Sequence, residues 1–273
     1  MTINKEISPI ELQTLSGKLR IKVLGLYKKA NAGHIGCSLS CIDLLIAALI
    51  HQKRPQDSFI LSKGHAAAAL YVALNYLGEI SDEVLETFYL DGTTLPAHPA
   101  PNQHAGIPFA TGSLGHGLPI ATGIAQANKL SESDGISFVL MSDGETNEGT
   151  TWEAAHYAIQ NQLDNLIVLI DRNGLQGFGY TTDILGNSAD AIKWKAIGFD
   201  VFEADGHNPA ELIEIIETAK NRSNGLPKVI IAHTIKGKGV SYMENRMEWH
   251  YLPMNDTQYE QAKSDVMNNY PAI

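Results

Sequence analysis

Two short apolar runs separated by a segment of helical length constrain the fold of this chain more than any other feature. Residues 138–141 and 166–170 are too short for helices and are rich in residues that favour strands. Residues 148–162, between them, have the length and composition of a helix. Because such a crossover is right-handed, the two strands are expected to be parallel, with both carboxyl ends at one edge of a sheet.

Oxygen-bearing side chains stand at the end of each strand. Ser142 and Asp143 follow the first, and Asp171 and Asn173 follow the second. We therefore expect Asp143 and Asn173 to meet in the crevice where open α/β sheets bind ligands. A carboxylate, an amide oxygen and a nearby backbone carbonyl suit an octahedral Mg²⁺ whose other ligands are water and phosphate oxygens.

Glycines and a helix start favour a bulky anion at the same place. Gly144 and Gly149 allow the backbone to approach it closely, and the helix that begins near Glu148 points its amino end at the site. The stretch D-G-E-T-N-E-G-T-T-W-E-A from Asp143, followed by Asn173, resembles the metal-diphosphate motif of thiamine diphosphate enzymes. It is most similar to that of transketolase.

Other transketolase motifs recur in the order in which that family carries them. A-N-A-G-H-I-G contains His34, S-K-G-H-A contains His65, L-P-A-H-P contains His98 and E-W-H ends in His250. T-G-S-L-G-H-G, residues 111–117, looks like the family's glycine-rich loop. The resemblance covers nearly the whole chain. It implies an α/β fold of the thiamine diphosphate-binding (PP) type, a mostly parallel sheet with helices on both faces, forming one domain over residues 1–273.

The resemblance also implies roles for individual residues. The metal, Mg²⁺ or another divalent cation such as Ca²⁺ or Mn²⁺, would be held by Asp143, Asn173 and the backbone carbonyl of Leu175. His34, His98 and His250 would line the substrate channel, where histidines can bind a sugar's hydroxyls and move its protons. The residues expected to contact thiamine diphosphate are His65, Gly112, Ser113, Leu114, Asp143, Gly144, Glu145, Asn173 and His250.

Glu148 has two interpretations. A carboxylate at a helix start suits the helix dipole. In transketolases the matching acid lies at the subunit interface and links two active sites, so we count Glu148 among the catalytic candidates.

The chain departs from the family at a few positions. Ser142 replaces the glycine that usually precedes Asp-Gly, Ser113 stands where proline is usual, and His116 where glutamine is. His98 is followed by Pro-Ala, where two-domain enzymes carry an acid after the proline. These differences concern the substrate more than the cofactor.

The activating half of the family's site has no counterpart in this sequence. In transketolases a glutamate that activates the cofactor, and an aromatic pocket for its pyrimidine ring, lie on a second domain, and nothing after Met254 resembles them. We therefore expect a separate C-terminal transketolase subunit carrying the pyrimidine-binding domain and the activating glutamate, in an α2β2 heterotetramer. The pair would transfer a two-carbon ketol unit from a ketose phosphate to an aldose phosphate, as in pentose phosphate metabolism.

Three alternatives remain open. The same half could serve a deoxyxylulose-phosphate-synthase-like or 2-oxo-acid decarboxylating complex, since a K-G-K-G loop like residues 236–239 occurs in such relatives, although E-W-H and the histidines favour transketolase. It could be a non-catalytic thiamine diphosphate-binding subunit, against which the intact set of site residues argues. A nucleotide-binding dehydrogenase is disfavoured because no G-x-G-x-x-G follows a first strand.

Composition and hydropathy limit the kinds of binding partner and the cellular compartment that we expect. A formal charge of −10 argues against nucleic acid, and the longest apolar run is too short to span a membrane. Residues 1–8 lack a signal-peptide pattern, so we expect a cytoplasmic protein. Cys37 and Cys41 suggest no disulfide or zinc site and are expected to be small buried residues. Lys63, Lys236 and Lys238 are phosphate-binding candidates, although solvated lysines are the more common outcome.

The remaining elements follow from periodicity and turn residues. Residues 91–109 carry four prolines and are expected to form a long irregular loop, with 236–239 a flexible basic loop. Strands are expected at 57–61, 199–205 and 228–233, and helices at 11–29, after Ser40, 66–77, 81–89, 118–129, from 208 and 257–267.

Overall fold

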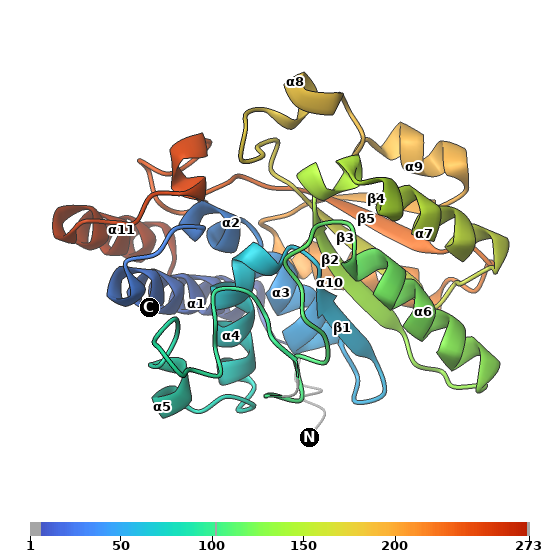
Figure 1. Ribbon diagram of the computed structural model, residues 1–273, viewed down its shortest axis with the longest axis horizontal. Helices are drawn as coiled ribbons and strands as arrows, with labels where there is room; N and C mark the ends of the chain where they lie inside the picture. The colour runs from blue at the N-terminus through green and yellow to red at the C-terminus, as the bar shows by residue number, and fades with distance from the viewer. Residues whose placement is uncertain (1–6, 102, 272–273) are drawn as a thin grey trace.

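A five-stranded parallel sheet organises the residues that this computed structural model describes, 7–101 and 103–271 (Figure 1). Residues 1–6, most of the stretch inspected for a signal peptide, lie outside that range. Neighbouring strands are parallel throughout, so the parallel pairing predicted for the two central strands is confirmed. The order is β1 (Ser58–Leu61), β2 (Ser137–Ser142), β3 (Leu166–Arg172), β5 (Lys228–His233) and β4 (Asp200–Asp205).

Helices cover both faces of the sheet, as the sequence predicted. Successive side chains of a strand point to opposite faces. Phe138 and Leu140 belong to one buried apolar cluster and Val139 and Met141 to the other. The first face carries α1 (Pro9–Ala30), α4 (Ala67–Tyr76) and α10 (Pro209–Asn221), and the second carries α6 (Gly117–Leu130), α7 (Gly149–Gln160) and α9 (Ala191–Ile197).

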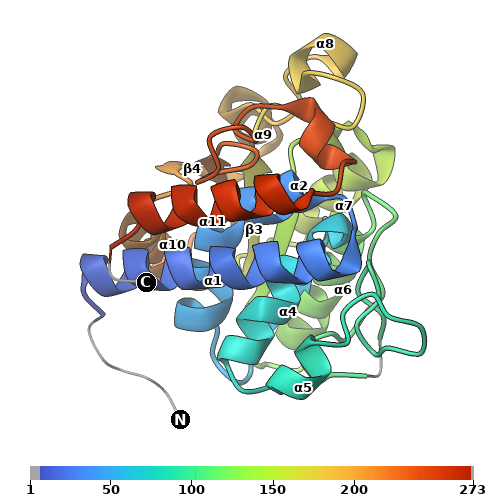
Figure 2. The same ribbon diagram turned by 90° about the vertical axis from the view of Figure 1, so that its left-hand side faces the viewer.

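Helix α11 (Asp256–Asn269) lies along α1, so the last helix packs beside the first (Figure 2). Both helices begin with a capping box, which satisfies backbone N–H groups that a helix start leaves unpaired. Ser8 and Glu11 form the box of α1, and Asn255 and Gln258 that of α11. No helix in the described part of the chain is long and apolar enough to cross a membrane.

The helix expected to begin at Ser40 is built differently. Helix α2 (Ile35–Ser40) ends there, and α3 (Ile42–Leu45) leads into a π-helical segment, Ile46–Gln52. Ser40 does not cap a helix because it is the last residue of α2, and its hydroxyl instead donates to the Asp171 carboxylate at 2.6 Å. A tertiary contact has replaced the local one.

Two further expectations needed correction. The helix predicted over 81–89 is only α5 (Asp82–Leu85), because the backbone of Tyr89 takes a left-handed conformation and its N–H bonds the Leu95 carbonyl. Helices α8 (Thr181–Leu185) and α9 were not predicted. The described residues of the 91–109 segment contain neither helix nor strand, as expected.

A buried ion pair fastens α1 to α3. The Arg20 guanidinium donates to Asp43 at 2.6 Å, with both side chains almost fully buried. His207, beyond β4, contacts the same carboxylate at 3.0 Å. Burial acts to raise the pKa of Asp43, but Arg20 and His207 outweigh it and hold that pKa well below its ordinary value.

Asp43→Asn should destabilise the fold severely because it leaves the buried Arg20 without its counter-charge. We expect the free energy of unfolding in urea at neutral pH to fall by about 3–5 kcal/mol. Glu86→Gln, which removes the exposed partner of Lys29, is the matched control and should cost less than about 1 kcal/mol. Equal losses in the two variants would contradict the structural role of the buried pair.

Candidate active site

Asp143 and Asn173 meet at the carboxyl ends of β2 and β3, as predicted. The two Asp143 carboxylate oxygens accept the N–H groups of Gly144, at 2.8 Å, and Gly174, at 2.6 Å. Asn173 donates its amide nitrogen to Asp171 at 3.3 Å, while its amide oxygen accepts the Leu175 N–H at 3.1 Å. The 173–175 turn is thereby held against the end of β2.

The Asp143 carboxylate is buried without a salt bridge to any residue of 7–101 and 103–271. It is 1% exposed, and burial, followed by the charge of Asp171, raises its pKa to about 6. No lysine, arginine or histidine of the described residues forms an ion pair with it. That part of the chain also holds no group of three or more His, Cys, Asp or Glu side chains arranged for a metal. The predicted set contains only one such side chain, with an amide and a carbonyl oxygen, and a divalent cation would supply the missing charge.

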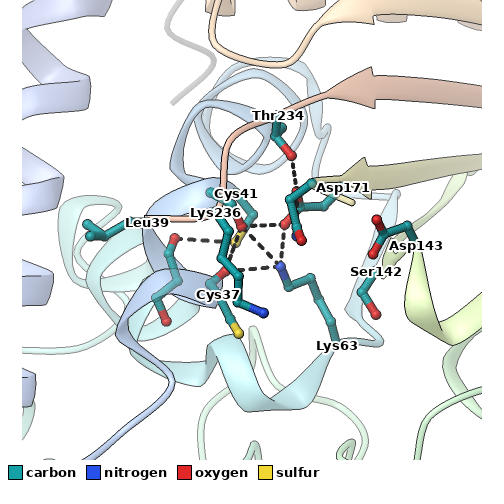
Figure 3. A network of polar contacts seen from close by, with 12 residues as sticks. Cys37, Leu39, Cys41, Lys63, Ser142, Asp143, Asp171, Thr234 and Lys236 are labelled. Carbon is teal, nitrogen blue, oxygen red and sulfur yellow. Dashed lines mark hydrogen bonds and ion pairs between the residues drawn. The ribbon is translucent and has the colours of Figure 1, made fainter. Parts of the chain in front are cut away.

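Lys63 and Asp171 form a fully buried ion pair beside Asp143 (Figure 3). Lys63 reaches across from the end of β1 and also donates to the Cys37 carbonyl at 3.0 Å. Burial acts to raise the pKa of Asp171, but Lys63 outweighs it and lowers that pKa. Thr234, at the end of β5, donates to the same carboxylate. The expectation of a solvated lysine is therefore wrong for Lys63.

Glu145 holds the glycine-rich loop from behind. Its buried carboxylate accepts the Gly115 N–H at 2.8 Å, the Ser62 hydroxyl, and the Ser142 N–H at 3.3 Å. Burial raises the pKa of Glu145 to about 7. The whole residue is 0% exposed, its N–H donates to the Ser142 hydroxyl and its carbonyl accepts the Glu148 N–H, so Glu145 supports the loop from within and its contact with a cofactor stays a prediction.

The open side of the same loop faces the histidines. Gly112 has a φ of 148°, which side-chain-bearing residues rarely adopt, and a Cβ there would lie 3.1 Å from His98. Gly64 is packed more tightly still, since its Cβ would lie 2.6 Å from the Thr111 carbonyl. Both glycines are needed for close backbone approach.

The four predicted histidines converge on one another. The ring of His34 lies 5.6 Å from that of His65, 5.8 Å from His98 and 5.2 Å from His250, centroid to centroid. Burial, followed by the neighbouring charges, lowers the pKa of His34 and of His250 to about 4. Burial also lowers the pKa values of His65 and His98. All four rings are therefore neutral at neutral pH, able both to donate and to accept hydrogen bonds.

Lys236 lies beneath this cluster. It is 1% exposed, and its ammonium donates to the Leu175 carbonyl at 3.2 Å and to Nδ1 of His250 at 2.8 Å. The prediction of a flexible, solvated loop is wrong for this residue. Cys37, buried as expected, places its sulfur 3.5 Å from the same ring nitrogen. Burial alone would raise the pKa of Cys37, but Lys236 and His65 outweigh it and lower that pKa to about 6.

The other candidates lie at the edge of the cluster. Ser113 is exposed and Leu114 half-buried on the glycine-rich loop. Glu148 is exposed at the start of α7, and a Cβ on Gly115 would lie 2.6 Å from its Cβ, so Glu148 flanks the loop without entering the histidine cluster. His104 bonds Thr94 at 3.0 Å, away from the cluster.

Sequence reasoning missed the buried support of the site. It assigned no role to Asp171 or Cys37 and considered Lys63 and Lys236 only as phosphate-binding or solvated side chains. The sequence did offer one indication: Asp171 follows five apolar residues of a buried strand, where a carboxylate requires a partner. Which lysine would supply that partner depends on tertiary structure.

Comparisons with known proteins agree with this geometry. The family model described as "Transketolase, thiamine diphosphate binding domain" matches residues 13–271. The chain is 40% identical over 272 residues to one of the subunits of the apulose-4-phosphate transketolase from Phocaeicola vulgatus, covering 96% of this chain and 95% of that protein. It is 35% identical to the 6-deoxy-6-sulfo-D-fructose transketolase subunit SqwG of a Clostridium species, covering 94% and 96%.

Solved structures give the same answer. The crystal structure of transketolase from Campylobacter jejuni superimposes with a TM-score of 0.86 at 30% identity, covering 93% of this chain. This chain spans 42% of the length of that one. Sequence and structure together show that the chain belongs to the transketolase family and corresponds to its thiamine diphosphate binding domain.

Proposed function

We propose that this chain is the diphosphate-binding subunit of a transketolase that transfers a two-carbon ketol unit from a ketose phosphate to an aldose phosphate. The observation that carries the proposal is the convergence of four neutral histidines beside a glycine-rich loop and near the buried Asp143 carboxylate, which forms no salt bridge with a described residue. The names of the two relatives, each of which is called a transketolase subunit, support a split enzyme. Their names also support a phosphorylated or otherwise acidic sugar as substrate.

Thiamine diphosphate and Mg²⁺, or Ca²⁺ or Mn²⁺ in its place, fit the residues present. Asp143, Asn173 and the Leu175 carbonyl offer hard oxygen ligands, and Asp143 needs a positive charge. A Cβ on Gly144 would lie 2.8 Å from the Gln176 side chain, so a larger residue next to Asp143 would force Gln176 to move. When bound, the cofactor supplies the electron sink for breaking and forming the carbon–carbon bond.

The histidines would bind the sugar and manage its protons. A ketol transfer requires protons to leave one hydroxyl and reach another oxygen, and a neutral imidazole can accept one and donate the other. His34, His98 and His250 present rings to one shared space, which suits a chain of adjacent hydroxyls. His65, the most buried of the four, is better suited to hold the cofactor.

A partner subunit completes this proposal. It would carry the pyrimidine-binding domain and the activating glutamate, in an α2β2 assembly with the cofactor between unlike subunits. The two relatives that are named transketolase subunits are covered over 95% and 96% of their own lengths, which supports such a division. The exposure of Glu148 leaves its carboxylate available to a neighbouring subunit.

Activity should require both chains. With thiamine diphosphate, Mg²⁺, a ketose phosphate and an aldose phosphate, this chain alone should give no ketol transfer, and adding the C-terminal transketolase subunit from the same source should restore it. Pyruvate should not replace the ketose, which distinguishes transketolase from the synthase-like and decarboxylating alternatives. Full ketol transfer by this chain alone would contradict the requirement for a partner. A mixture of the two chains that binds the cofactor but transfers no ketol unit would favour the non-catalytic alternative.

Asp143→Asn should abolish metal-dependent cofactor binding. Losing a directly coordinating carboxylate should weaken thiamine diphosphate binding by more than about 100-fold in Mg²⁺, at least the effect of losing an outer-shell ligand. Calorimetry on the assembled subunits measures this, with the exposed Asp91→Asn as matched control. Undiminished binding would refute the metal assignment.

His98→Ala should separate sugar chemistry from cofactor binding. We expect kcat/KM for the ketose to fall by about 10²–10⁴-fold, the range for a lost proton-transfer group. The affinity for thiamine diphosphate should change little, and His51→Ala, distant from the cluster, should leave both quantities near wild type. A large loss of cofactor affinity would instead assign His98 to cofactor binding.

A further inference from the structure

The groups around Nδ1 of His250 determine which of its ring nitrogens carries the proton. The Lys236 ammonium lies 2.8 Å from Nδ1 and the Cys37 sulfur 3.5 Å from it. An ammonium can only donate, so a hydrogen bond from Lys236 requires Nδ1 to be unprotonated and puts the proton on Nε2. A Cys37 thiolate would demand the opposite, a protonated Nδ1 that donates to sulfur. The two neighbours therefore predict different tautomers.

Distance and burial favour Lys236 over Cys37 as the group that sets the tautomer of His250. A separation of 2.8 Å is typical of a hydrogen bond from a charged nitrogen, whereas sulfur is a weak partner. Lys236 is buried, so its ammonium depends on protein acceptors. The described residues provide two, the Leu175 carbonyl and Nδ1 of His250. If Nδ1 of His250 were protonated, the buried Lys236 ammonium would keep one of these two acceptors, the Leu175 carbonyl.

The other ring nitrogen is left available. Nε2 of His250 has no hydrogen-bonding partner within residues 7–101 and 103–271. It lies near the backbone of Gly177, where a Cβ would be 3.7 Å away. A proton held on Nε2 is thus free to be donated to a ligand oxygen.

We propose that Lys236 is a positioning residue that fixes His250 as the Nε2–H tautomer, making His250 a dedicated hydrogen-bond donor to a hydroxyl, carbonyl or phosphate oxygen. The consequence for turnover rests on the proposed transketolase function. Neither ring nitrogen of His34 or His98 is hydrogen-bonded to a described residue, so those two rings can take either tautomer. Accepting a proton from the sugar then falls to His34 or His98, and not to His250.

Nitrogen-15 NMR of the full chain labelled at histidine tests this directly, because protonated and unprotonated ring nitrogens differ strongly in chemical shift. The His250 signals are identified by their loss in His250→Gln. We expect an unprotonated Nδ1 and a protonated Nε2 at neutral pH. A protonated Nδ1 would overturn the proposal.

Three variants identify the cause. In Lys236→Met the ratio of the Nε2–H to the Nδ1–H tautomer of His250 should fall by about tenfold or more, the effect of losing a hydrogen bond from a charged donor. Lys236→Arg, which also only donates, should restore the Nε2–H form, and Cys37→Ser should leave it unchanged. A tautomer that survives Lys236→Met, or that changes in Cys37→Ser, would assign control elsewhere.

A kinetic readout links the tautomer to turnover. In the assembled enzyme, Lys236→Met should raise the KM for ketose or lower kcat, with partial recovery in Lys236→Arg. The NMR measurement needs neither partner, cofactor nor sugar. A protonated Nδ1 of His250 in a protein that is active with its partner therefore refutes only this proposal. The Nε2–H tautomer in a protein that shows no ketol transfer refutes only the proposed function.

Discussion

The buried ion pair between Lys63 and Asp171 is the interaction on which the arrangement of the site depends. Placing two charges in the interior is costly unless each is paired and hydrogen-bonded. Asp171 satisfies that requirement with Ser40 from α2, Thr234 after β5 and the Asn173 amide. These hydrogen-bonding partners lie on the segments that carry the site. The buried pair is therefore stable only when those segments are in their observed positions.

The same pair explains why one strand-end carboxylate is available to a cation. β2 and β3 each end near an aspartate, but Lys63 pairs with only one of them. Asp171 is held ionised, whereas burial and the nearby Asp171 charge raise the pKa of Asp143. A divalent cation at the proposed metal site would therefore meet a carboxylate that pairs with no charged group of the described residues. Two chemically identical side chains acquire different roles from a single lysine.

Neutral histidines on the other side of the glycine-rich loop suit a ligand that is itself anionic at one end and polar at the other. Burial suppresses their charge, so they can exchange hydrogen bonds with such a ligand as neutral rings. Lys236 lies beside one of these rings and forms hydrogen bonds with both the Leu175 carbonyl and His250. One buried ammonium therefore bonds both a carbonyl of the proposed metal site and a ring of the proposed sugar channel.

Local sequence patterns determined the parallel sheet, the β2–α7–β3 unit and the meeting of Asp143 with Asn173, because strand period, crossover handedness and turn glycines act over short stretches. The motifs also identified the family and the four histidines that converge. Only the tertiary structure decided that Ser40 bonds Asp171 instead of capping a helix, that Glu145 faces inward, and that Lys63 and Lys236 are buried. The physical reason is that a charged or hydroxyl side chain takes whichever partner desolvation leaves within reach, and that partner comes from a distant part of the chain.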